Sequence, residues 1–219
     1  MKGEPQKPMK KSRNKWIIDE SKCLGHNEVT LLRTAAVERL TFGKKSHKLN
    51  FIRDWFMVEL GLNTGLRVAE MASLRHQDVY IDGDRSSVTV VGKGGKKRAI
   101  WISSNFKQIC IAYTEFKQRL GLSTDRDSFL LNPAQGGGIS KRSLQKAFKN
   151  LLSKAKLPSH YSIHCLRHTY STFLLRASAN NYRFTQQQLG HSSIRTTQVY
   201  ASVVESDARR ALEKLYTNP

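Results

Sequence analysis

Three short β-type runs, set inside a chain with an otherwise helical pattern, most restrict how this protein can fold. The runs are Val79 to Ile81, Ser87 to Val91 and Arg98 to Ile102. Asp82-Gly83-Asp84 and Gly92-Lys93-Gly94-Gly95 separate them as turns. The sequence therefore predicts a mainly α domain with a small three-stranded antiparallel β-sheet, an α+β fold.

Apolar residues recur at helical spacing on both sides of the predicted sheet. Before the sheet we expect one helix from Asn27 to Leu40, capped by Asn27, and a second from Leu49 to Leu62. A third, from Arg67 to Leu74, would be capped by Thr64. After the sheet, the predicted helices are Phe106 to Leu120, Ser140 to Ala155, His164 to Ala177 with Ser162 as its cap, Phe184 to Leu189, Ser193 to Ala201 and Glu205 to Tyr216.

The charge balance of the 219 residues indicates the class of partner. The chain has 37 Lys and Arg against 17 Asp and Glu, a formal net charge of +20. Such a surface attracts polyanions, and nucleic acid is the first candidate because neutralised phosphates drive most of its binding to proteins. An anionic membrane surface is the second candidate, and a solvated basic surface without a partner is the third. No apolar stretch is long enough to span a bilayer, so no membrane-embedded segment is expected.

The first 22 residues differ in composition from the remainder, residues 23–219, which are expected to form one domain. They are rich in lysine, with Pro5 and Pro8 and few apolar residues, and we expect a flexible basic arm. The alternative is a cloning remnant or a disordered tail. No hydrophobic region follows the basic residues, so this is not a signal peptide. The widely spaced Cys23, Cys110 and Cys165 fit a reducing compartment, and a cytoplasmic location is expected.

The predicted helix from Ser140 to Ala155 is unusually basic. Its apolar stripe consists of Leu144, Phe148, Leu151 and Leu152. It contains no acidic residue, and we expect it to lie along a DNA backbone; the alternative is a solvated face. The residues expected to contact DNA from this helix are Lys141, Arg142, Lys146 and Lys149.

The segment TGLRVAE places Arg67 at the start of a helix, directly after a glycine turn. A helix N-terminus favours anions, and a guanidinium there can hold two phosphate oxygens at once. Glu70, three residues further on, can hold that guanidinium in place. Taken alone, this segment is better explained as an ordinary ion pair on a helix surface.

The segment VGKGGKKR predicts a β-turn tipped with lysines. A lysine on a flexible turn can enter a site and donate a proton to a leaving alkoxide, and nearby cations would lower its pKa. The alternative is a basic hairpin that touches only the DNA backbone. The other DNA-binding candidates of this hairpin are Lys96, Lys97 and Arg98.

The segment HCLRH places His164 and Arg167 on one face of a helix, and His168 follows one turn after His164. The spacing of the two histidines also suits zinc. However, the catalytic Glu of the zinc motif is missing, and Arg167 would place a fixed positive charge beside the metal. We therefore expect no metal site, and His168 can instead be a hydrogen-bonded histidine of the core.

The segment LGHSSIRTTQVY ends one predicted helix at Gly190 and begins another after a serine. His191 lies in the turn, and Tyr200 follows one to two helical turns later. The chain has seven tyrosines, so the position of Tyr200 after this turn, rather than its residue type, singles it out.

Together the four segments supply two arginines, two histidines, a lysine and a tyrosine. This set suits the transfer of a phosphodiester onto an amino-acid oxygen, because preorganised cations stabilise the charge on the non-bridging oxygens in the transition state. A tyrosine, with a pKa near ~10, needs a cationic neighbourhood or a base to attack at neutral pH. No cofactor is expected, since the arginines take the place of a metal and a phosphotyrosine link retains the energy of the cut bond.

These segments resemble the catalytic domain of the tyrosine recombinase family, also called the phage integrase family. The segments TGLRVAE, GKGGKKR, HCLRH and LGHSSIRTTQVY occur in the family's order, over roughly Asn27 to Tyr216. The resemblance implies that Arg67 and Arg167 bind the scissile phosphate. It also implies that His164 and His191 assist them and help in proton transfer.

By the same resemblance, Lys93 would be the general acid, and Tyr200 would form the 3′-phosphotyrosine and free a 5′-hydroxyl. Glu70 would buttress Arg67, and His168 would have a supporting role. The last helix would pack on a neighbouring protomer and couple the active sites of a homo-tetramer on double-stranded DNA.

Family members usually carry a separate helical core-binding domain that closes a clamp around DNA. Residues 1–48 are too short to supply it, so we expect it to be absent here. The implied function is site-specific DNA recombination, as in integration, excision or resolution, for a mobile element in a prokaryotic or phage context, in association with the nucleoid. DNA relaxation of the type IB topoisomerase kind, or a non-catalytic DNA-binding regulator on the same fold, are the alternatives.

Overall fold

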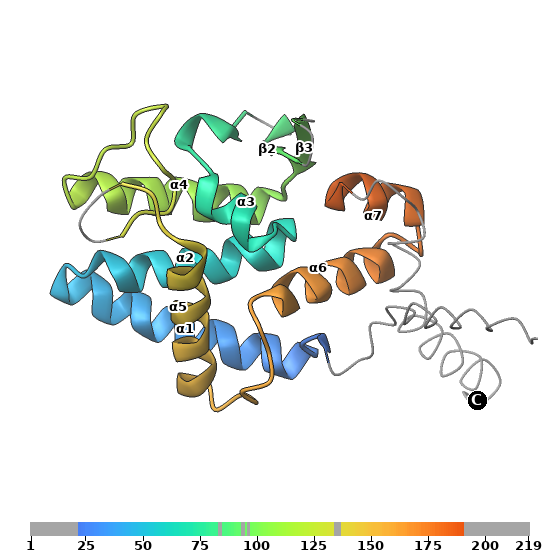
Figure 1. Ribbon diagram of the computed structural model, residues 1–219, viewed down its shortest axis with the longest axis horizontal. Helices are drawn as coiled ribbons and strands as arrows, with labels where there is room; N and C mark the ends of the chain where they lie inside the picture. The colour runs from blue at the N-terminus through green and yellow to red at the C-terminus, as the bar shows by residue number, and fades with distance from the viewer. Residues whose placement is uncertain (1–21, 83–84, 93–94, 96, 134–136, 191–219) are drawn as a thin grey trace, which may run out of the picture.

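The computed structural model describes residues 22–82, 85–92, 95, 97–133 and 137–190, and it confirms a mainly helical domain with one small sheet (Figure 1). The predicted basic arm up to residue 21 and the two predicted helices after residue 190 lie outside the described residues. No described helix is both long and apolar enough to cross a membrane. The helices are α1 (His26–Ser46), α2 (Leu49–Thr64), α3 (Val68–Ser73), the 3-10 helix η2 (His76–Asp78), α4 (Ser104–Arg119), α5 (Lys141–Lys154), α6 (His164–Ala177) and α7 (Tyr182–Leu189).

The sheet consists of β1 (Val79–Tyr80), β2 (Ser87–Val91) and β3 (Lys97–Trp101) in that order, and both pairs of neighbouring strands are antiparallel, as predicted. In the register, Val88 lies opposite Ile100, and Val90 lies opposite Arg98. Val88, Val90 and Ile100 are buried, whereas Val91 is exposed, so the sheet places one face on the core.

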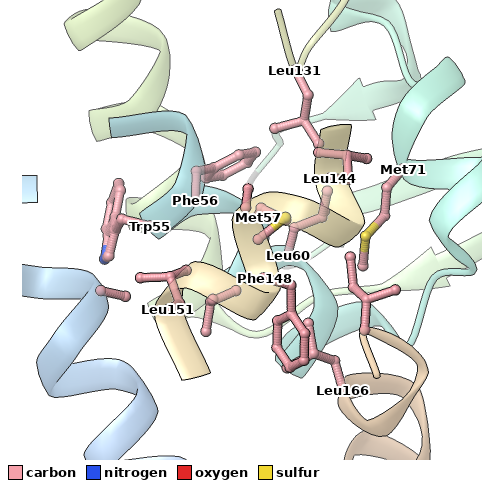
Figure 2. Close-up of a cluster of buried hydrophobic side chains, with 14 of the residues drawn as sticks. Trp55, Phe56, Met57, Leu60, Met71, Leu131, Leu144, Phe148, Leu151 and Leu166 are labelled. Carbon is pink, nitrogen blue, oxygen red and sulfur yellow. The ribbon is translucent and has the colours of Figure 1, made fainter. Parts of the chain in front are cut away.

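Helix α2 lies at the centre of the domain and packs against α1, α4, α5 and α6. Its apolar residues occur all round the helix, which is typical of a buried helix. Figure 2 shows Phe56, Met57 and Leu60 of α2 among side chains of the surrounding elements, including Phe148 of α5 and Leu166 of α6. These side chains form one continuous core, which holds the segments that carry the candidate site.

Two helix starts differ from the predicted ones for the same physical reason. Gly25, not Asn27, is the N-cap of α1, and its N–H donates to Glu28 Oε2 at 2.7 Å. Likewise Arg67, not Thr64, is the N-cap of α3, while the Thr64 hydroxyl is buried and donates to the carbonyl of Leu60. In both helices a glutamate three residues after the N-cap accepts the N–H of the cap, which sets the start of the helix.

Of the caps predicted for α5 and α6, one is confirmed and one is wrong. Ser140 Oγ accepts from the N–H of Ser143 at 3.0 Å, which confirms its predicted role at the start of α5. At α6 the predicted cap is wrong: Ile163 is the N-cap, and Ser162 contributes its carbonyl, which accepts from the N–H of Cys165 at 2.8 Å.

Helices α2 and α6 cross closely at Gly61. A Cβ atom there would lie 2.6 Å from Cδ1 of Leu166, which is too close for any side chain larger than hydrogen. The close crossing brings the end of α2, and the turn that follows it, beside the first half of α6. These are the segments that carry Arg67 and Arg167.

Candidate active site

The turn before Arg67 is shaped by a glycine. Gly65 ends α2 with a φ of +60°, in the left-handed region, and its N–H donates to the carbonyl of Gly61 at 3.0 Å. A Cβ atom at Gly65 would lie 2.4 Å from Cδ1 of Tyr170 on α6. Both the backbone conformation and the space therefore require glycine, and the turn holds Arg67 close to α6.

Arg67 shares the carboxylate of Glu70 with a second arginine, Arg98 of β3. The backbone N–H of Arg67 donates to Glu70 Oε2 at 2.8 Å, and its Nη1 donates to Oε1 at 3.1 Å. Nη1 and Nη2 of Arg98 donate to Oε1 and Oε2 at 2.8 and 3.1 Å. Burial raises the pKa of Glu70, but the bonds and charges of the two arginines lower it more, and the net pKa is below its ordinary value.

Arg167 on α6 is buried and ties two distant segments together. Its Nη1 donates to the carbonyl of Gly65 at 2.6 Å, and its Nη2 donates to the carbonyl of Leu189 at 2.9 Å. One guanidinium therefore joins the turn before α3 to the end of α7. The carbonyl of Gly65 that it bonds belongs to the residue two positions before Arg67, so the two arginines lie in adjoining segments of the fold.

The two described histidines of the candidate site have lowered pKa values. Partial burial and the positive charges of Arg167 and Arg67 lower the pKa of His164, which lies at the first turn of α6. Burial, and then the charges of His164 and Arg167, lower the pKa of His168 to about 4. Both imidazoles are therefore neutral near pH 7, the form that can accept a proton.

The structure thus brings together five of the residues that sequence reasoning selected: Arg67, Glu70, His164, Arg167 and His168. Arg67 remains 44% exposed at its side chain, so its guanidinium faces solvent as well as Glu70. The site presents positive charge and a neutral histidine at one surface, which suits a phosphate group. The other selected residues of the site, Lys93, His191 and Tyr200, lie outside the described residues, as does Lys96.

Two of the residues expected to contact DNA are engaged within the protein. Arg98 is turned inward onto Glu70, because residues of β3 alternate between the two faces of the sheet, whereas Lys97 is exposed. Lys149 is on the outside of α5, but its Nζ donates to the carbonyls of Ser159 and Tyr161, each at 2.6 Å. It thus fastens the segment that precedes α6.

The remaining basic residues selected on α5, Lys141, Arg142 and Lys146, are exposed. The stripe opposite them is buried as predicted, so the helix presents one apolar and one basic face. Among the described residues there is no group of three or more His, Cys, Asp or Glu that could hold a metal ion.

Sequence reasoning missed the residues that hold the site from behind. They include the carbonyls of Gly65 and Leu189, which have no signature in a sequence because every residue carries one. Gly190 ends α7, as predicted, with a φ of +64°, but the sequence did not indicate that it would lie against the side chain of Arg98. The excess of Lys and Arg over Asp and Glu was the one signal that Glu70 could pair with a second base.

Comparisons with known sequences agree with the geometry. The sequence model of the phage integrase family matches residues 24–206. Tyrosine recombinase XerC of Vibrio cholerae serotype O1 (strain ATCC 39541) is 36% identical over 149 residues, which cover 68% of this chain and 46% of the relative. XerC of Caldanaerobacter subterraneus is 34% identical over 163 residues, which cover 74% and 44%. This chain spans about half the length of the curated relatives that it matches.

Solved structures with a similar fold include XerA recombinase, at 26% identity and a TM-score of 0.69, with 90% of this chain and 66% of that chain covered. XerH site-specific recombinase bound to its difH substrate has a TM-score of 0.66 at 19% identity, with 82% and 50% covered. The catalytic domain of bacteriophage HP1 integrase has a TM-score of 0.57 at 22% identity, with 90% and 97% covered. The predicted fold, that of a tyrosine recombinase catalytic domain, is confirmed.

Proposed function

This chain belongs to the phage integrase family, and on that premise we propose that it cuts and rejoins double-stranded DNA at specific sites through a covalent phosphotyrosine. The observation that carries the proposal is the meeting of Arg67, His164 and Arg167. Arg167 bonds the carbonyl two residues before Arg67, and the charges of both arginines act on His164. Two segments that are far apart in sequence, the turn before α3 and the start of α6, therefore supply one cationic surface.

In the proposed reaction, Arg67 and Arg167 bind the non-bridging oxygens of the scissile phosphate. Their charges stabilise the transition state, in which negative charge spreads over these oxygens. The hydroxyl oxygen of Tyr200 attacks phosphorus, and the bond from phosphorus to the 5′-oxygen breaks. The neutral His164, with His191, helps to take up the tyrosine proton, and Lys93 gives a proton to the departing 5′-oxygen.

Rejoining reverses these steps on a different strand. A free 5′-hydroxyl attacks the phosphotyrosine, the bond to Tyr200 breaks, and the phosphodiester forms again without an external energy source. Residues Lys141, Arg142, Lys146 and Lys97, which are exposed, would bind the DNA backbone as point charges. XerH, which has a similar fold, was solved with its DNA substrate, and lambda integrase was solved as a tetramer bound to a Holliday junction. We propose DNA binding and assembly into a homo-tetramer for this chain.

The test is covalent capture on nicked DNA that carries the flanking repeats of the chain's own element. We expect the wild type to form a protein–DNA adduct that survives denaturation, with or without EDTA. Tyr200→Phe should bind the same DNA and form no adduct, because it lacks the attacking oxygen. Tyr80→Phe is the matched control: Tyr80 is an exposed tyrosine of β1 whose hydroxyl bonds to Asp82, and its loss should leave the adduct unchanged.

The outcomes separate the alternatives. An adduct with Tyr200→Phe would show that the nucleophile is another residue. DNA binding by the wild type without any adduct would favour a non-catalytic regulator. Relaxation of supercoiled plasmids by a monomer, without a defined site, would favour a DNA-relaxing activity of the type IB topoisomerase kind.

A further inference from the structure

We propose that Arg98 is a positioning residue of the active site, which fixes Glu70 and the end of α7 and thereby holds Arg67 ready for a phosphate. The inference rests on the proposed function, because it assumes that Arg67 binds the scissile phosphate. It differs from the expectation from sequence, in which Arg98 was a direct contact to DNA.

The first support is the geometry of the pair between Arg98 and Glu70. Two parallel hydrogen bonds of 2.8 and 3.1 Å join the two Nη atoms of Arg98 to the two carboxylate oxygens. The side chains are 14% and 9% exposed, so the pair is largely removed from water. A bidentate pair of an arginine and a carboxylate is both strong and fixed in its relative orientation. Arg98 is therefore the rigid partner of Glu70.

The second support is the difference between Arg98 and Arg67, which share the same carboxylate. Arg67 donates one side-chain bond of 3.1 Å to Glu70, and its side chain is 44% exposed. With two guanidinium groups and one carboxylate, the cluster keeps a net charge of +1. If Arg98 were absent, Glu70 would neutralise Arg67 alone, and the attraction of Arg67 for a phosphate would fall. Arg98 thus supplies the second positive charge that leaves Arg67 available.

The third support is the contact between Arg98 and the end of α7. A Cβ atom at Gly190 would lie 2.4 Å from Cδ and 2.5 Å from Nε of Arg98, so the side chain of Arg98 lies directly on this glycine. The neighbouring residue, Leu189, gives its carbonyl to Arg167. One arginine from β3 and one from α6 therefore hold the same helix end, and Arg98 joins β3, α3 and α7.

The experiment uses the full chain and separates binding from cleavage. DNA affinity is measured by fluorescence anisotropy, and the rate of adduct formation is measured in single turnovers at saturating nicked DNA. Arg98→Ala should lower the cleavage rate by about 100-fold, the order of effect expected from a small misplacement of a catalytic group, with little change in Kd. Arg98→Lys should not restore the rate, because an ammonium group cannot form the two parallel hydrogen bonds of a bidentate pair.

Two comparisons make this test specific. In a Glu70→Gln background, Arg98→Ala should have a much smaller further effect on the rate, because Arg98 acts through Glu70. Arg119→Ala is the charge-matched control: Arg119 is 72% exposed on α4, its ion pair with Glu115 is 3.8 Å long, and its loss should change neither quantity.

A weaker Kd for Arg98→Ala at an unchanged saturating rate, with the Kd restored by Arg98→Lys, would mean a direct phosphate contact and would overturn the proposal. Amide hydrogen exchange gives a readout that needs no cleavage. The first turn of α3 and the amide of Gly190 should exchange faster in Arg98→Ala than in Arg119→Ala. If the wild type forms no Tyr200-dependent adduct, the proposed function fails, and exchange alone decides: unchanged protection in Arg98→Ala would refute the role of Arg98.

Discussion

Replacement of Arg167 by alanine should lower the stability of the folded domain as well as stop DNA cleavage. The guanidinium is buried and donates to the carbonyls of Gly65 and Leu189 at 2.6 and 2.9 Å. The truncation removes the donors of both carbonyls and leaves space in the interior between α6, α7 and the turn after α2. The exposed Arg67, by contrast, makes its side-chain bond at the surface.

The expected magnitude follows from these contacts. A buried acceptor that loses its donor costs about 1–3 kcal/mol, and two such carbonyls together cost about 3–5 kcal/mol once some water enters the space. For a domain of this size, that loss lowers Tm by roughly 10 °C. Arg67→Ala should cost no more than about 1 kcal/mol, because an exposed ion pair contributes little and Glu70 keeps its two bonds to Arg98.

The assay is urea unfolding of the wild type, Arg167→Ala and Arg67→Ala, followed by circular dichroism, beside the covalent capture of nicked DNA. Both variants should fail to form the adduct, and Arg167→Ala alone should have a clearly lower midpoint of unfolding. Equal midpoints for all three proteins would refute the reasoning, since the two carbonyls would then have been satisfied without Arg167.

Two further predictions concern the buried contact between α4 and η2. Lys117 is fully buried, and its Nζ donates to the carbonyl of Phe129 and to Oδ1 of Asn132, each at 2.7 Å. Lys117→Met should therefore lower the free energy of unfolding in urea by about 3–5 kcal/mol. The control Arg119→Ala, two residues further on, should leave the midpoint unchanged. Burial and the charge of Lys117 lower the pKa of His76 to about 4, so below pH 6.5 the unfolded chain takes up a proton that the folded protein does not. The free energy of unfolding should therefore fall as the pH drops from 6.5 to 4. His76→Gln, which keeps an acceptor for Lys117, should make this fall smaller. An identical pH profile of urea midpoints for the wild type and His76→Gln would contradict this explanation.

Much of the fold could be predicted because its signals are local. The change from helical spacing to short β-type runs located the sheet, and the short turns between the runs indicated the antiparallel pairing that the structure has. The cap of α5 at Ser140 was correct because a hydroxyl needs only a nearby N–H. The predicted caps of α1 and α3 were wrong because a second residue type can also set the start of a helix. Here Glu28 and Glu70 accept the N–H of Gly25 and Arg67, and these two residues are therefore the N-caps.

By itself, the sequence determined the fold class, the family and five residues that meet in the described part of the site, because spacing along the chain and residue type are local properties. Tertiary structure alone decided what those residues touch. Arg98 finds Glu70 across 28 positions, and Arg167 finds the carbonyl of Gly65 across 102. Such partners depend on which segments the core packs together, and a backbone carbonyl is the same chemical group at every position, so no pattern in the chain marks the one that will be used.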